Sequence, residues 1–202
     1  MKKYLDRTCL WGDIFAKAID GGHHSSPLGL ADIVYEGMAW SVKTVKAKKP
    51  LIARDIRLIS GRNDIGDSFD IRDAFDDLTV TGNKVLEIWN ERVNIAKDSY
   101  EPLRTCVLIR NFNALEFTIF EYETTRFDPQ GFAWRLNKNN NLQGYDKATG
   151  KHKFTWQTGG RQFTIKCSVP ASARRFKLRR PSIEFEAIIE RLNFDPSWVT
   201  IL

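Results

Sequence analysis

Cysteine and histidine are both scarce in this sequence, which excludes the scaffolds that depend on them. The 202 residues include three cysteines and three histidines. The cysteines stand singly and form no CxxC pair, which argues against a disulfide framework. His23 and His24 are neighbours in a loop of Gly, Ser and Pro, and His152 is far away along the chain. A structural zinc site is therefore not expected, and the paired histidines are interpreted as surface residues.

Long apolar runs are absent too. No stretch approaches the roughly 18 residues that span a membrane. The start, MKKYLDRTCLW, has no apolar segment long enough for a signal peptide. None of the motifs GxGxxG, GxxxxGK(S/T), GxSxG and HExxH occurs, which argues against an unrelated metabolic enzyme. We expect a cytoplasmic protein.

Positive charge is present in excess, and it is concentrated in one place. The whole chain carries a formal charge of +6. Residues 147–180 include no Asp or Glu and carry +10 by themselves, so the rest of the chain is net −4. A concentrated basic segment is typical of a surface that faces a polyanion. A solvated basic face without a partner is the alternative.

Hydrophobic periodicity predicts a mixed α/β fold. Helices are predicted over 8–19 and 83–100, and strands over 28–35, 38–45, 56–59, 105–109 and 115–122. The turn Glu36-Gly37 joins the first two strands as a hairpin, and an acidic, irregular stretch covers 64–80. Shorter strands are predicted over 132–136, 152–157, 162–167 and 176–178, and a last helix over 183–192. The result is an α-β-β-β-α-β core over 1–125 and a basic β-rich lobe over 126–202, or one domain containing both.

The predicted hairpin sets charged residues among apolar ones. Asp32 is placed in its first strand, and Ser41 and Lys43 in its second. Ser41 and Lys43 are two residues apart and so share one face of the strand, and the short turn brings Asp32 beside them. An ordinary cross-strand ion pair is the alternative. Charges set in apolar strands, however, tend to be functional or deliberately paired.

This combination of side chains suits phosphodiester hydrolysis. A carboxylate holds Mg²⁺, which prefers oxygen ligands and keeps several waters. The metal polarises the phosphate and acidifies a water. A lysine beside it stabilises developing charge or orients the attacking water. A polar residue two positions before the lysine joins the metal shell, directly or through water.

The pattern resembles the PD-(D/E)XK nuclease superfamily, in which an Asp precedes a (D/E)-x-K tripeptide within an α-β-β-β-α-β core. Asp32 matches the Asp and Ser41-Val42-Lys43 matches the tripeptide, with Ser in place of the acidic residue. Ala31 stands where Pro is usual. The resemblance covers residues 8–110, and the strings GLADIVYEGMAWSVKTVK and LISGRN are similar to type II restriction enzymes.

The resemblance implies a restriction-endonuclease-like core and a Mg²⁺-dependent, site-specific endonuclease that cuts both strands of double-stranded DNA and leaves 5′-phosphates. Asp32 and a second acidic residue would then hold the metal. Relatives with S-x-K recruit that acid from a nearby helix, so Glu87 is the candidate, with Glu36 and Asp13 as alternatives. A homodimer would match two cuts in a palindrome.

Several polar segments are candidates for DNA contacts, because Arg pairs well with guanine and Asn or Gln with adenine. The candidate base-contacting residues are Arg62, Asn63, Arg110, Asn111, Gln157, Arg161 and Gln162. Arg174 and Arg175 are expected to hold phosphates. We expect the aromatic residues Trp134, Trp156 and Phe163 in the core of the lobe rather than stacked on bases. The alternative function is a non-catalytic DNA- or RNA-binding protein that uses the basic lobe alone.

Overall fold

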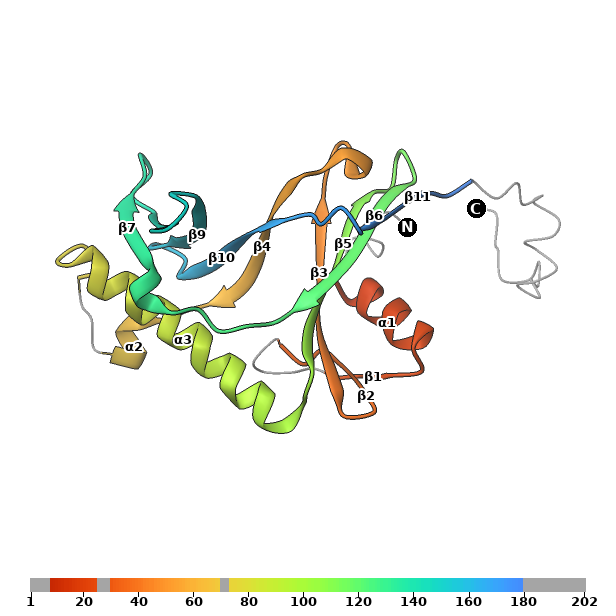
Figure 1. Cartoon of the computed structure of the whole chain (residues 1–202), viewed down its shortest axis with the longest axis horizontal. Coiled ribbons are helices and arrows are strands. Elements are labelled where there is room, and N and C mark those ends of the chain that lie inside the picture. Colours follow the sequence, from red (N-terminus) through yellow and green to blue (C-terminus); the bar gives the residue numbers. More distant parts are fainter. Residues whose placement is uncertain (1–7, 25–29, 70–72, 180–202) are drawn as a thin grey trace, which may run out of the picture.

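Two β-sheets organise the chain (Figure 1). The computed structural model describes residues 8–24, 30–69 and 73–179. The first sheet contains, in spatial order, β1 (Gly22–His23), β2 (Ile33–Tyr35), β3 (Met38–Lys46), β5 (Leu103–Asn111), β6 (Glu116–Glu123) and β11 (Arg174–Lys177). The second contains β4 (Asp55–Arg62), β10 (Gln162–Ser168), β9 (His152–Gln157), β8 (Leu142–Asp146) and β7 (Phe132–Leu136). The predicted α/β class is confirmed.

The first sheet is mixed because a helix separates two of its neighbouring strands in the chain. β2 and β3 form the predicted antiparallel hairpin, with Tyr35 opposite Met38. β3 and β5 run parallel, so that Ser41 lies beside Thr105 and Lys43 beside Val107. A parallel pair needs a crossover, and the long helix between these strands supplies it. β5 is buried from Thr105 to Arg110, as expected for an inner strand.

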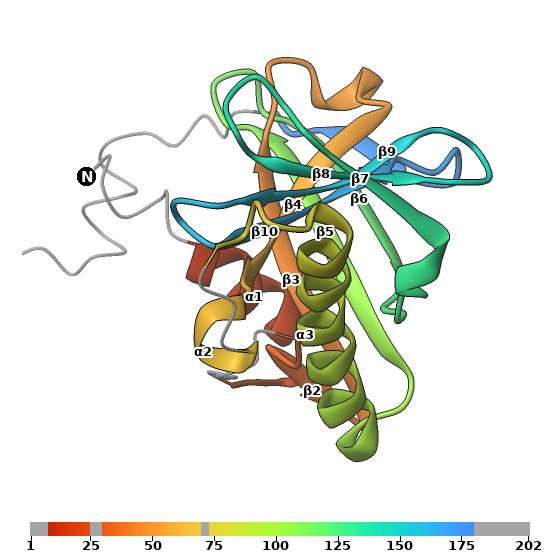
Figure 2. The same cartoon turned by 90° about the vertical axis from the view of Figure 1, so that its left-hand side faces the viewer.

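The helices lie on opposite faces of the first sheet. α1 (Thr8–Ala18) packs against Ile33, Trp40 and Val42. α3 (Leu78–Ser99) lies on the other side and runs beneath the second sheet (Figure 2). The Asp77 carboxylate caps α3 by accepting hydrogen bonds from the amides of Thr79 and Val80. This cap explains why the helix begins at Leu78 rather than at the predicted position 83.

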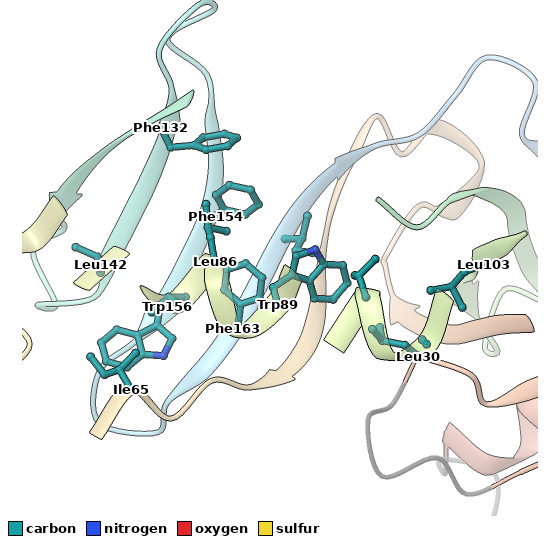
Figure 3. Close-up of a cluster of buried hydrophobic side chains, with 14 of the residues drawn as sticks. Leu30, Ile65, Leu86, Trp89, Leu103, Phe132, Leu142, Phe154, Trp156 and Phe163 are labelled. Atoms are coloured by element: carbon teal, nitrogen blue, oxygen red, sulfur yellow. The ribbon is translucent and has the colours of Figure 1, made fainter. Parts of the chain in front are cut away.

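The largest hydrophobic core joins the two sheets through α3 (Figure 3). Leu86 and Trp89 of the helix meet aromatic residues of the second sheet, among them Phe154 and Phe163. The same cluster continues to Leu103 of the first sheet. Trp134, Trp156 and Phe163 are all buried, which confirms their predicted place in the core. Because these contacts span both sheets, they hold α3 in one position relative to each.

The third predicted core strand does not join the first sheet. β4 pairs with β10 in the second sheet, so that this sheet combines residues from both sides of position 125. The helical turn η1 (Pro50–Ile52) precedes β4 and separates it from β3. Along β4, Ile56, Leu58 and Ser60 are buried and the residues between them are exposed. The strand therefore has one interior face, which it turns toward Val107 and Ile109 of β5.

Other predicted boundaries change in the structure. β2 begins at Ile33, so the expected strand over 28–35 is shorter and Asp32 lies just before it. β1 and β8 were not predicted, because β1 has only two residues and β8 contains Gly144, which weakens the strand pattern. A short helix, α2 (Ile65–Phe69), lies within the acidic stretch. The helix predicted over 183–192 lies outside the described residues. Within the described part of the chain, no helix combines the length and apolarity needed to cross a membrane.

Candidate active site

Asp32 is held at the point where the β2–β3 hairpin opens. Its backbone amide donates to the carbonyl of Trp40 in β3, directly before β2 begins. Its side-chain Oδ2 then accepts the next amide of β3, that of Val42, at 2.9 Å. The carboxylate thus replaces a strand as the partner of β3, which fixes its position and explains why β2 begins only at Ile33, directly after Asp32.

Ser41 and Lys43 lie on the same face of β3 as predicted. Ser41 is completely buried, and its hydroxyl donates to Asp32 Oδ2 at 3.4 Å. Lys43 is half-buried. Burial lowers the pKa of the Lys43 ammonium, the negative charge of Asp32 opposes this shift, and the positive charge of Arg92 adds to it. The charges of Asp32, Lys43 and Arg92 are therefore close enough to act on one another.

Arg92 enters the site from α3, and no sequence pattern singled it out. Burial lowers the pKa of its guanidinium, and the charge of Asp32 opposes the shift. Its Nη1 donates to the carbonyl of Ser60 in β4 at 2.7 Å. A usable signal was its spacing: Arg92 lies three residues after Trp89 and four before Ala96, on the apolar stripe of the helix. We refer to Asp32, Ser41, Lys43 and Arg92 together as the Asp32 centre.

The acidic candidates lie apart from these side chains. Glu87 is half-buried and pairs with Lys84 at 2.6 Å, on its own helix. It precedes Arg92 by five positions, which corresponds to about 140° around the helix and about 7.5 Å along it. Glu36 is exposed in the β2–β3 turn with a φ of 46°. Asp13 pairs with His23 at 2.6 Å from α1, on the opposite face of the sheet.

The donor set at the Asp32 centre fits a magnesium ion only in part. Asp32 offers a carboxylate and Ser41 a hydroxyl, while Lys43 and Arg92 bring positive charge. Within residues 8–24, 30–69 and 73–179, no group of three or more His, Cys, Asp or Glu side chains lies close enough to hold a metal. A Mg²⁺ ion commonly takes one or two carboxylates and completes its shell with water and substrate phosphates. Asp32 would be the protein ligand in such an arrangement.

Two of the candidate DNA-contacting segments meet at one end of the second sheet. Arg62 of β4 lies opposite Gln162 of β10, and Gln162 lies opposite Gln157 of β9. Arg62 and Gln157 are exposed. Arg161 has a φ of 53° in the turn between β9 and β10, and its guanidinium pairs with Asp64. We call these four residues the β9–β10 end.

Asn63 has an interior position instead of an exposed one. It is completely buried, and its Nδ2 donates to the carbonyl of Val85 at 2.7 Å. Its own carbonyl accepts the indole N–H of Trp156 at 2.9 Å. In this conformation Asn63 connects β4, α3 and β9, and its side chain is not presented to a ligand.

Arg110 and Asn111 lie at the end of β5, away from the β9–β10 end. Arg110 is only 8% exposed and stacks over Phe112, with 4.4 Å from its Cζ to the ring centre. Asn111 donates to the carbonyl of Lys48 and accepts from the amides of Asn113 and Ala114. Its side chain therefore shapes the β5–β6 turn.

Arg174 and Arg175 are exposed on β11, which is bonded to β6 at the edge of the first sheet. Their neighbour Phe176 stacks on Phe117 with 5.4 Å between ring centres. This contact attaches the strand to the sheet while the guanidinium groups remain accessible. Exposed arginines in this setting suit phosphate contacts, which need charge rather than a shaped pocket.

Comparison of the chain with protein-family models, with curated proteins and with solved structures finds no match in any of the three.

Proposed function

We propose that this chain is a cytoplasmic, Mg²⁺-dependent, site-specific endonuclease of the type II restriction kind, built on a restriction-endonuclease-like core. One observation carries the proposal. The Asp32 carboxylate is fixed by the Val42 amide and the Ser41 hydroxyl, and the half-buried charge of Lys43 is held beside it on the same face of the sheet. A structural ion pair needs neither the fixed carboxylate nor the withdrawal of the lysine from water.

Asp32, Ser41 and Lys43 each have a defined role in hydrolysis of a phosphodiester. A water oxygen attacks phosphorus, the bond to the 3′-oxygen breaks, and that oxygen leaves with a proton, so the products are a 5′-phosphate and a 3′-hydroxyl. Lys43 stabilises the negative charge that develops on the phosphate. Ser41 keeps Asp32 oriented through its hydroxyl. When bound, Mg²⁺ supplies electrostatic activation of phosphate and water, with Asp32 as its ligand from the protein.

A second acidic ligand is the open part of this proposal. Glu87 remains the candidate, and its participation requires that it leave Lys84. The pair is of the i,i+3 type, and its side chains are 34% and 42% exposed. Such pairs stabilise a helix by only about 0.2 to 0.5 kcal/mol, so breaking this pair costs little.

The remaining basic residues would hold and read the DNA. The β9–β10 end presents Arg62, Gln157 and Gln162 together, as base contacts require. Arg174 and Arg175 would contact phosphates from β11. A homodimer would supply two such centres for the two strands of the duplex.

The test is incubation of the purified protein with unmethylated phage DNA, with and without Mg²⁺. Asp32→Ala and Lys43→Ala are compared with Asp98→Ala and Lys17→Ala, two exposed charges outside the centre. We expect discrete fragments that require Mg²⁺, persist in both control variants and disappear in both centre variants. The result that contradicts the proposal is DNA that is bound equally by all five proteins and is never cut.

That outcome would favour the second candidate function, a non-catalytic DNA- or RNA-binding protein. The observation on its side is that the described residues assemble no group of three or more possible metal ligands. In that case the Asp32 centre would be a structural ion pair and the basic strands would supply the binding.

A further inference from the structure

Arg92 of α3 contacts both β4 and its own helix. Its Nη1 donates to the carbonyl of Ser60 at 2.7 Å. Its Cζ lies 5.9 Å from the ring centre of Trp89, which is itself buried in the core that joins the two sheets. The guanidinium plane is therefore fixed from two sides, by β4 and by its own helix.

Gly61 makes room for this guanidinium. A Cβ atom at Gly61 would lie 2.7 Å from Arg92 Nη1 and 2.9 Å from Nη2, closer than real contacts allow. Gly61 also has a φ of 106°, a conformation that other residues rarely adopt. The backbone of β4 thus approaches the arginine at the one position where the strand has no side chain.

The position of Arg92 connects two parts of the proposed site. On one side the charge of Asp32 acts on it and on Lys43 alike. On the other, its partner Ser60 precedes Arg62 of the β9–β10 end by two residues, about 7 Å along a strand. A duplex that contacts the β9–β10 end and the Asp32 centre together would pass this guanidinium.

We propose that Arg92 binds a non-bridging oxygen of the DNA phosphate at the Asp32 centre, an inference that rests on the nuclease function proposed above. A guanidinium has five N–H donors in a rigid fork, so one arginine can hold Ser60 and a phosphate oxygen at the same time. With Lys43 it gives the centre two positive charges against the single carboxylate of Asp32, which favours an anionic substrate. The helix α3 therefore contributes a phosphate-binding cation to the site.

The test combines DNA binding and cleavage for Arg92→Gln and Arg92→Lys. The control is Arg126→Gln, because Arg126 is an exposed arginine that also contacts α3, through Asn94 at 3.2 Å. Binding is measured with Ca²⁺ in place of Mg²⁺ over a series of salt concentrations. Thermal unfolding of each variant is recorded beside it.

We expect Arg92→Gln to reduce the steepness of the fall of log K with log salt by about 1, because one phosphate contact is lost. Cleavage at saturating DNA should fall by about 10²-fold or more. Arg92→Lys should keep the slope and still lose cleavage, because a lysine lacks the planar fork. Arg126→Gln should resemble the unaltered protein in both measurements.

The outcomes separate this inference from the nuclease function. If the protein cuts DNA and Arg92→Gln matches it in slope and rate, the role of Arg92 is overturned and the nuclease stands. If the protein binds DNA without cutting and Arg92→Gln still lowers the slope, the phosphate contact stands and the nuclease is overturned. If Arg92→Gln unfolds, Arg92→Lys decides: cleavage equal to that of the unaltered protein overturns the inference. A protein that neither binds nor cuts DNA overturns both.

Discussion

The Asp32 centre and the arginines of β11 both carry positive charge, but the protein holds that charge in different ways. At the centre, Lys43 and Arg92 are half-buried, and the Asp32 carboxylate that acts on both is tied to the backbone of β3. On β11, Arg174 and Arg175 are exposed, and the guanidinium of Arg175 donates to the carbonyls of Ala171 and Ala173 just before its own strand. The protein therefore fixes the position of the charge at the Asp32 centre and leaves the charge on β11 in contact with solvent. If the proposed nuclease function is right, catalysis and DNA affinity should be separable by mutation, and the following predictions test this.

The largest effect is expected from Lys43→Met, which removes a half-buried charge and leaves an unbranched apolar side chain one atom shorter. Cleavage should fall by about 10²-fold or more, because the cation next to the phosphate is lost. Stability should be unchanged or rise by about 1 kcal/mol, because burial disfavours the charged form of Lys43, as its lowered pKa indicates. Single-turnover cleavage and urea unfolding measure the two quantities. A variant that loses stability and activity together would show that Lys43 is structural.

An intermediate effect is expected from Gly82→Ala, which disturbs the helix that carries Arg92. A Cβ at Gly82 would lie 2.1 Å from the ring of buried Trp134. The clash should destabilise the fold by about 1 to 3 kcal/mol, partly offset by about 1 kcal/mol from better helix propensity. Thermal unfolding is the measurement, and Gly159→Ala is the matched control because its Cβ would meet open space. Equal melting temperatures for the two variants would mean that α3 tolerates a shift at this contact.

The smallest effect is expected from Arg174→Gln combined with Arg175→Gln. Removing two exposed charges should make the fall of log K with log salt less steep by up to about 2. Binding near 0.1 M salt should weaken by about 10-fold. The cleavage rate at saturating protein should stay within about twofold, because neither residue lies at the Asp32 centre. Salt-dependent anisotropy and single-turnover kinetics provide the two readouts. A slower rate at saturation would show that β11 also positions the DNA.

The local part of the site could be predicted because it depends on short spacings. Glu36-Gly37 predicts a tight turn, and the two-position spacing of Ser41 and Lys43 places both on one face of a strand. The hairpin is present as predicted, and Asp32 lies next to Ser41. The start of β2 was missed because the Asp32 side chain takes the amide that a strand would otherwise bond.

The distant part of the site could not be predicted in the same way. Arg92 comes to the centre only because α3 packs between both sheets, and periodicity marks which side of a helix is buried without saying what it meets. Asn63 was predicted to be exposed for base contacts, yet its side-chain Nδ2 donates to the carbonyl of Val85, a residue of α3. Glu87 was predicted as the second acid because it is a carboxylate on the nearby helix. Its position around the helix relative to Arg92 mattered only once the structure had placed Arg92 at the centre.

By itself, the sequence determined the α/β class, the hairpin with its Asp-Ser-Lys pattern, and the concentration of basic residues after position 147, because each depends on local periodicity or composition. Only the tertiary structure decided that β4 joins the second sheet, that the charge of Asp32 acts on Arg92, and that Arg62 and Gln157 lie on either side of Gln162. These outcomes depend on pairings between residues far apart in the chain. Such pairings form where apolar faces can be buried together, and no single segment carries that information.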